Sequence, residues 1–282
     1  LDVSSMDRTA DPCVDFYQFA CGGWQKNNPI PDDQPRWSVY GKATQDNQRY
    51  LWGILQGLAE RTDARDPRQT QLGDYFAACM NEEAVEKRGV EPLATDLARI
   101  AAMNSVKELP ATLARLQFDT ASSGFFFGFG SNQDFADSSS VIAFAVAGGL
   151  GLPDRDYYLK TDAKSQSIRD KYVAHIATMM KLLGDSDELA RRSAAAVMTI
   201  ETALASASLS MVDKRDPYKS FHKMNGKQLR ALTPSFDWNQ YLKGVGADRV
   251  TKFNVTEPEF FKAFDDLLKS SNLHDIKTYM RW

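Results

Sequence analysis

Residues 163–208 read AKSQSIRDKYVAHIATMMKLLGDSDELARRSAAAVMTIETALASAS, and this stretch decides the fold class. Apolar side chains recur every three or four positions through both halves, which is the period of an α-helix with one buried face. Gly184 interrupts the pattern between the two halves. The stretch therefore predicts two long helices, at about 163–183 and 187–208, that pack side by side as an antiparallel helical hairpin.

Helical spacing also dominates the rest of the chain, with one exception. Residues 124–130 read GFFFGFG and residues 141–149 read VIAFAVAGG, with polar residues between them. Two β-rich runs around a polar turn predict a β-hairpin or a small sheet. The predicted fold class is therefore mainly α with a small β-hairpin or sheet. Further helices are expected at 44–60, 72–89, 91–102, 109–118, 226–232, 238–243, 258–269 and 275–282, and a short strand is expected at 250–255.

Composition places the chain among ordinary globular proteins. Its 282 residues are 43% hydrophobic and 25% charged, which allows one large domain or two smaller ones. The formal net charge is -3 and the charges are interspersed, so we expect no nucleic-acid partner. No apolar run approaches the roughly 18 residues that a membrane-spanning helix needs, so we expect no membrane segment in this chain.

The three cysteines, Cys13, Cys21 and Cys79, cannot all pair with one another because their number is odd. Asp11 is a good helix N-cap and the Gly-Gly pair after Cys21 a good helix end, so one helix is expected to hold the first two cysteines. Eight helical residues at about 1.5 Å each would separate them by about 12 Å, whereas a disulfide needs Cα atoms within about 7 Å. Either these are buried thiols of a cytosolic protein, or their partners lie outside this chain.

The catalytic motifs that depend on spacing are missing from the chain. Its histidines are His175, His222 and His274; none is followed by Glu and no two are four residues apart, so an HExxH zinc helix is excluded. No cysteine pair has zinc-finger spacing, and there is no GxSxG elbow or Walker loop. We therefore predict no catalytic residue and no metal ligand in this chain. On the residues alone, a binding or structural module is the favoured interpretation.

Four segments, taken together, change that interpretation. Residues 11–31, DPCVDFYQFACGGWQKNNPIP, resemble the start of the neprilysin and endothelin-converting-enzyme family of zinc metalloendopeptidases. Residues 75–92, YFAACMNEEAVEKRGVEP, and residues 150–158, LGLPDRDYY, resemble two further segments of that family. The last residues, HDIKTYMRW at 274–282, resemble the helix that leads into its catalytic half. The resemblance covers essentially the whole chain, in the right order.

The resemblance implies a fold of two lobes around a central cavity. In the family, a thermolysin-like lobe holds the zinc ligands, and a largely helical lobe covers the site and admits only short peptides. This chain would be mostly the helical covering lobe, and the zinc cofactor would be bound by a C-terminal half that is absent here. The expected division is 1–45 as a segment that packs on the absent catalytic lobe, 46–270 as the covering lobe, and 271–282 as the start of the connection between lobes.

The resemblance also implies roles for single residues. The family equivalents of Cys13, Cys21 and Cys79 bond to cysteines in the C-terminal half, which implies an oxidising, extracytoplasmic location: secreted, periplasmic or a membrane-anchored ectodomain. Arg36 falls where the family has an arginine that reaches the primed side of the substrate, a task that suits a guanidinium. Some members place an Asp five residues later, where this chain has Gly41.

Two functions remain open after this comparison. The first is the N-terminal helical lobe of a zinc metalloendopeptidase that hydrolyses short peptides, in which this chain forms the cavity wall, limits substrate size and is inactive alone. Its partners would be peptide substrates and the catalytic lobe of the same protein. The alternative is a non-enzymatic helical binding module derived from that lobe.

Overall fold

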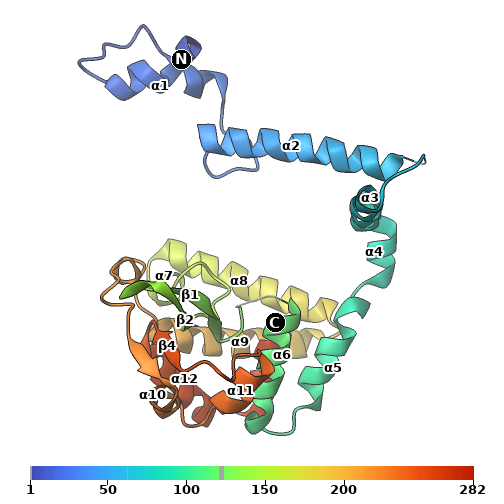
Figure 1. Cartoon of the computed structure of the whole chain (residues 1–282), viewed down its shortest axis with the longest axis vertical. Helices are drawn as coiled ribbons and strands as arrows, with labels where there is room; N and C mark the ends of the chain where they lie inside the picture. The colour runs from blue at the N-terminus through green and yellow to red at the C-terminus, as the bar shows by residue number, and fades with distance from the viewer. Residues whose placement is uncertain (1, 62, 121–123) are drawn as a thin grey trace. The chain divides into compact units, whose positions relative to one another are not determined.

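The computed structural model describes residues 2–61, 63–120 and 124–282. It divides into two compact units, Leu1–Gly89 and Val90–Trp282, and Figure 1 labels most of their helices and strands in chain order. The expected division at 45 and 270 concerns the lobes of a longer protein and stays a prediction.

Within residues 2–61 and 63–89, all regular structure is helical. Polar side chains begin the longer helices: Ser38 accepts a hydrogen bond from the N–H of Gly41, and Asp66 accepts one from that of Arg68. Gly89, with a φ of 50°, ends the last helix, as the sequence predicts. The elements are η1 (Val3–Ser5), α1 (Phe16–Asn27), α2 (Val39–Glu60), α3 (Pro67–Met80) and α4 (Glu82–Arg88).

The predicted start of α1 is wrong. The helix begins at Phe16 because Asp15 is its N-cap, accepting a hydrogen bond from the N–H three residues further on. Asp11 instead holds a turn before the helix, where its carboxylate accepts from the N–H of Cys13 at 2.8 Å. Cys13 therefore lies outside α1 while Cys21 lies within it, and the separation calculated for a shared helix does not apply.

The predicted end of α1 is also wrong. The helix runs through Gly22 and Gly23 to Asn27. A Cβ on Gly23 would lie 2.4 Å from the carbonyl oxygen of Ser4 and 2.7 Å from that of Met6. The glycine pair therefore allows the backbone of residues 4–6 to approach the helix closely, and this tertiary contact outweighs the tendency of glycine to end a helix.

The first unit buries almost no apolar surface of its own. At Gly73 an added Cβ would lie 2.6 Å from the carbonyl oxygen of Leu58, so α3 crosses close to α2. The rings of Trp52 and Phe76 meet edge to face, with centroids 5.0 Å apart. Among the described residues of this unit only Gly73 and Gly22 are buried. Large apolar side chains are exposed instead, among them Val14, Phe16, Tyr17, Ile30, Val39, Tyr40, Tyr50, Leu51 and Leu72.

The second unit contains the predicted β-hairpin. β1 (Phe127–Asp134) and β2 (Asp137–Ala147) pair antiparallel, with Phe127 opposite Ala147 and Ser131 opposite Ala143. Both strands extend further into the polar segment than predicted, so that residues 135–136 alone make the turn. The hairpin is confirmed, and the polar residues belong to its exposed end.

Two further strands complete a four-stranded sheet of order β1-β2-β4-β3. β4 (Lys252–Val255), which matches the expected strand, lies parallel to β2 with Phe253 opposite Ala143. β3 (Lys223–Asn225), which no pattern predicts, pairs antiparallel with β4. β1 therefore forms one edge of the sheet.

The predicted helical hairpin is confirmed as α8 (Ala163–Leu182) and α9 (Asp187–Ala207), which lie side by side. Asp162 and Ser186 cap the two helices at their N-termini, and Gly184 turns the chain between them with a φ of 98°. The other elements of this unit are η2 (Glu91–Leu93), α5 (Ala94–Ala102), η3 (Val106–Glu108), α6 (Leu109–Thr120), α7 (Asp156–Leu159), η4 (Asp213–Arg215), α10 (Gly226–Leu232), α11 (Trp238–Gly244), α12 (Pro258–Ser270) and α13 (Leu273–Arg281).

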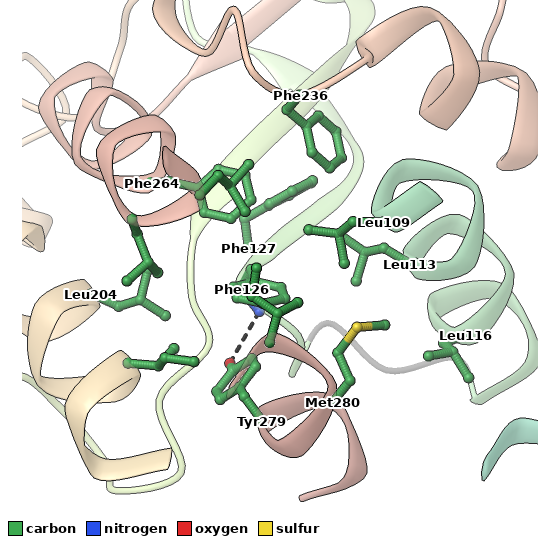
Figure 2. Packing of buried hydrophobic residues seen from close by; sticks show 14 of the residues in the cluster. Leu109, Leu113, Leu116, Phe126, Phe127, Leu204, Phe236, Phe264, Tyr279 and Met280 are labelled. Carbon is green, nitrogen blue, oxygen red and sulfur yellow. Dashed lines mark hydrogen bonds between the residues drawn. The ribbon is translucent and has the colours of Figure 1, made fainter. Parts of the chain in front are cut away.

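An aromatic core joins the sheet of the second unit to its helices. Figure 2 shows Phe127 at the start of β1, facing Phe264 from α12, with ring centroids 5.7 Å apart. Phe126 packs on Tyr279 of α13 at 4.5 Å and donates its backbone N–H to the tyrosine hydroxyl at 3.1 Å. These contacts fix the start of β1 against the last helix, so the hairpin and the C-terminal end of the chain form one packed body.

Candidate functional site

Arg36 lies in the loop between α1 and α2, two residues before the N-cap of α2. Its side chain is exposed and forms no hydrogen bond or ion pair with any described residue. The backbone N–H groups at the start of α2 add positive potential near the loop, while Asp32 and Asp33, also exposed, add negative charge. The guanidinium is therefore available to a carboxylate or carbonyl group from another molecule.

Gly41, where the family resemblance implies an aspartate in some members, lies in the first turn of α2. An added Cβ there would lie 3.2 Å from Cε3 of Trp37. The indole thus occupies the space that a larger side chain would need. An acidic partner for Arg36 at this position would require Trp37 to move.

The three cysteines are free, and their exposure does not match three buried thiols. Cys13, in the turn before α1, and Cys79, near the end of α3, are exposed, and Cys21 on α1 is partly buried. The expected bonds to a C-terminal half remain a prediction. An exposed thiol is open to a partner from outside the chain, which a buried one is not.

The histidines do not gather into a site. His175 lies on α8, His222 precedes β3 and His274 lies on α13. Within the described residues, no group of three or more His, Cys, Asp or Glu side chains is placed to hold a metal ion. These residues therefore do not fit a zinc site, and we derive no catalytic step for them.

Sequence reasoning missed one cluster of titratable groups, centred on Glu201 in α9. This glutamate is 1% exposed. Its carboxylate accepts hydrogen bonds from the Tyr158 hydroxyl at 2.6 Å, from the Tyr172 hydroxyl at 2.9 Å and from the Trp282 indole N–H at 3.2 Å. The signal was present, because Glu201 follows Val197 by four positions on the buried face of α9, where a charged residue is rare unless it is paired.

Burial and hydrogen bonding act in opposite directions on this carboxyl group. Burial raises the pKa of Glu201, and the donated hydrogen bonds of Tyr158 and Tyr172 oppose the rise by favouring the ionised form. Burial, and then the charge of Glu201, raises the pKa of both tyrosines, so their hydroxyls remain protonated donors. The cluster is enclosed and fully hydrogen bonded, which suits a structural role better than a catalytic one.

The segment LGLPDRDYY at 150–158 is shaped by this cluster. A Cβ on Gly151 would lie 1.9 Å from the Tyr172 hydroxyl, so only glycine permits the approach. Asp154 accepts a hydrogen bond from the N–H of Asp156 at 2.8 Å, and the carbonyl of Tyr157 accepts from the guanidinium of an arginine on α8 at 2.8 Å. The segment therefore fixes the turn between the hairpin and the two long helices.

No described helix combines the length and the apolar character needed to cross a bilayer.

Comparison with known proteins places these features in a family. The model of the N-terminal part of peptidase family M13 matches residues 12–282. Human endothelin-converting enzyme 1 is 30% identical over 292 residues, covering 99% of this chain and 37% of the relative. Neprilysin-3 of Drosophila melanogaster is 29% identical over 282 residues, covering 94% of this chain and 35% of the relative. The chain thus spans well under half the length of the curated relatives it matches.

A solved structure agrees with the fold. The zinc metalloprotease Zmp1 of Mycobacterium tuberculosis, in complex with an inhibitor, superposes with a TM-score of 0.88 and 28% identity, over 100% of this chain and 43% of that one. The predicted resemblance and the mainly helical fold class with a small sheet are both confirmed. The chain belongs to peptidase family M13, and it corresponds to the N-terminal part of that family.

Proposed function

We propose that this chain is the N-terminal helical part of a zinc metalloendopeptidase of short peptides, in which it forms the cavity wall and limits substrate size. The observation that carries the proposal is the match along 99% of this chain to little more than a third of endothelin-converting enzyme 1. The described residues offer no group that fits zinc. The zinc ligands and the catalytic base would therefore lie in sequence beyond these 282 residues.

The surface of the first unit supports a second lobe as its partner. Val14, Phe16, Tyr17 and Ile30 expose 84%, 68%, 66% and 59% of their surface. All four lie in the segment 1–45 that is expected to pack on the catalytic lobe. Large apolar side chains exposed to this degree are typical of a surface that another part of a protein covers.

The cysteines support the same partner. Cys13 and Cys79 are exposed and no two of the three cysteines are bonded. Disulfides to the C-terminal half would tie the helical lobe to the catalytic one, and such bonds persist in oxidising compartments. We therefore propose an extracytoplasmic location, whether secreted, periplasmic or as a membrane-anchored ectodomain.

Metal content and activity test the main proposal. The 282-residue chain alone is expected to bind no stoichiometric zinc and to cleave no peptide, while the protein extended by the reading frame beyond Trp282 does both and loses both to a chelator. Stoichiometric zinc with chelator-sensitive cleavage from residues 1–282 alone would refute it. A reading frame that stops at Trp282 would favour the non-enzymatic binding module instead.

Arg36 is the residue of this chain that we propose to contact substrate. Its exposed guanidinium has no partner among the residues that the structure describes and would pair with a carboxylate or carbonyl on the primed side of a bound peptide. In the complete enzyme, Arg36→Ala should lower kcat/KM for peptides with a free C-terminal carboxylate by about tenfold, and less for the same peptides as amides. Arg68→Ala, an exposed arginine on α3, is the matched control. An unchanged ratio between acid and amide substrates would remove Arg36 from the site.

A further inference from the structure

A cavity of about 780 Å³ opens in the second unit at one end of the sheet. Ser131 of β1 and Ala143 of β2, which lie opposite each other in the hairpin, contribute to its lining. Their small side chains leave room on the sheet face that Phe127, two pairs further along, fills with a buried ring. Cavities of this volume are typical of sites for small molecules or for a few residues of peptide.

The walls of the cavity are mainly apolar and open to solvent. Phe118 of α6 and Val141 of β2 are 65% and 71% exposed. Phe129 packs edge to face on Tyr241, with ring centroids 5.5 Å apart, and Val250 lies on the loop before β4. These side chains would lose contact with water when an apolar group enters, which favours its binding.

One cation at the cavity has no partner in the described chain. Arg249 lines the cavity and is exposed, and its side chain forms no hydrogen bond or ion pair with a described residue. No acidic side chain is among the lining residues. The charge of the site therefore complements an anion, and a guanidinium suits a carboxylate.

Unpaired polar groups indicate a peptide as the source of that carboxylate. Ser131 and Thr251 line the cavity, and their hydroxyls form no hydrogen bond within the described chain. Gln117 donates to the carbonyl of Phe127 at 2.7 Å, from the side of β1 that faces away from β2. Because alternate residues of an antiparallel strand point their backbone groups the same way, those of Phe129 and Ser131 also point outward. The backbone groups of a bound peptide can form hydrogen bonds with them, so that the peptide extends the sheet at its β1 edge.

We propose that this cavity binds the C-terminal end of a peptide whose last residue is apolar. The apolar side chain enters the space above Ser131 and Ala143, and the terminal carboxylate pairs with Arg249. The site belongs to the second unit alone, so it depends neither on Arg36 nor on peptidase activity.

Titration calorimetry of the 282-residue chain tests the chemistry of the ligand. The probe is the N-acetylated tripeptide alanyl-alanyl-leucine with a free carboxylate, compared with its C-terminal amide and with decanoate. The acid should bind about tenfold or more tightly than the amide, and added salt should weaken binding of the acid alone, because only the acid gains the ion pair with Arg249. Equal affinities of acid and amide would overturn the proposal, and so would decanoate binding as tightly as the peptide acid, since it lacks the peptide groups.

Two pairs of variants locate the binding. Ser131→Phe should fill the cavity and abolish binding, while Asn132→Phe, whose side chain points to the opposite face of exposed β1, should leave it unchanged. Arg249→Gln should weaken binding of the acid by about tenfold without affecting binding of the amide. Lys243→Gln, on α11 and outside the lining residues, removes the same charge elsewhere and is the control for net charge. Binding of the acid that is unchanged in Ser131→Phe or in Arg249→Gln would refute the assignment.

Discussion

Replacing Glu201 with alanine tests how the second unit is held together. The carboxylate, carried by α9, is the shared acceptor for groups from three other parts of the chain: Tyr158 of α7, Tyr172 of α8 and Trp282 after α13. Without it, the two tyrosine hydroxyls lose a buried acceptor. Trp282 keeps one, because its indole N–H also donates to the Tyr172 oxygen at 3.1 Å.

The size of the effect follows from those two hydroxyls. A buried donor left without an acceptor costs about 1–3 kcal/mol, and the space vacated by the side chain adds to the loss. Removing a buried charge offsets part of it, because ionised groups are costly to desolvate. We expect Glu201→Ala to lower the free energy of unfolding by about 2–5 kcal/mol. For a unit of this size, that corresponds to a fall in Tm of roughly 5–15 °C.

Urea unfolding followed by circular dichroism measures this change, and hydrogen exchange of the α9 amides assigns the transition to the second unit. Glu188→Ala is the matched control, since it lies on the same helix with its side chain 72% exposed and should change stability by about 0.5 kcal/mol or less. A Glu201→Ala protein as stable as Glu188→Ala would show that the hydrogen bonds around this carboxylate do not support the fold.

Two further predictions concern the same cluster. Burial raises the pKa of Glu201 in the folded protein above its usual 4.5, so the folded state holds the proton more tightly than the unfolded state, and the free energy of unfolding should fall as the pH rises through the carboxyl range. Urea unfolding from about pH 4 to 8 should show this decline in the wild type relative to Glu201→Gln. Parallel stability curves for the two proteins would contradict it. Gly151→Ala should lower the free energy of unfolding by about 1–3 kcal/mol in the same measurement, because the added Cβ would overlap the Tyr172 hydroxyl. Gly130→Ala, which has open space around it, should have little effect. Equal stabilities of the two variants would refute the close approach.

Sequence patterns predicted the parts of the fold that depend on near neighbours. The stripe through α8 and α9 and the apolar runs of β1 and β2 are local signals, and both hairpins form where expected. β3 was missed because it has three residues and exists only through its pairing with β4. The glycine pair after Cys21 gave a wrong helix end, because its role is to let another part of the backbone approach the helix closely, which no local pattern reveals.

The candidate sites likewise differ in whether their signal in the sequence is local. The family resemblance selected Arg36 and the cysteines, and the structure adds only their exposure and lack of partners. Glu201 was within reach, because a charge on a buried helical face is a local signal, but its partners at 158, 172 and 282 are brought together only by the fold. The cavity beside Ser131 had no signal at all, since it arises where small residues of separate strands meet.

The parallel pairing of β2 with β4 has a consequence for how the chain is made. The inner edge of β2 stays uncovered until Phe253, which pairs with Ala143 from roughly 110 positions later in the chain, has been synthesised. On the ribosome, the β-hairpin and the pair α8–α9 can form early, while the open side of β2 stays available to other nascent strands. Slow translation between these points would prolong that exposure, so chaperone dependence during synthesis should track the arrival of residues 252–255 rather than that of the helices.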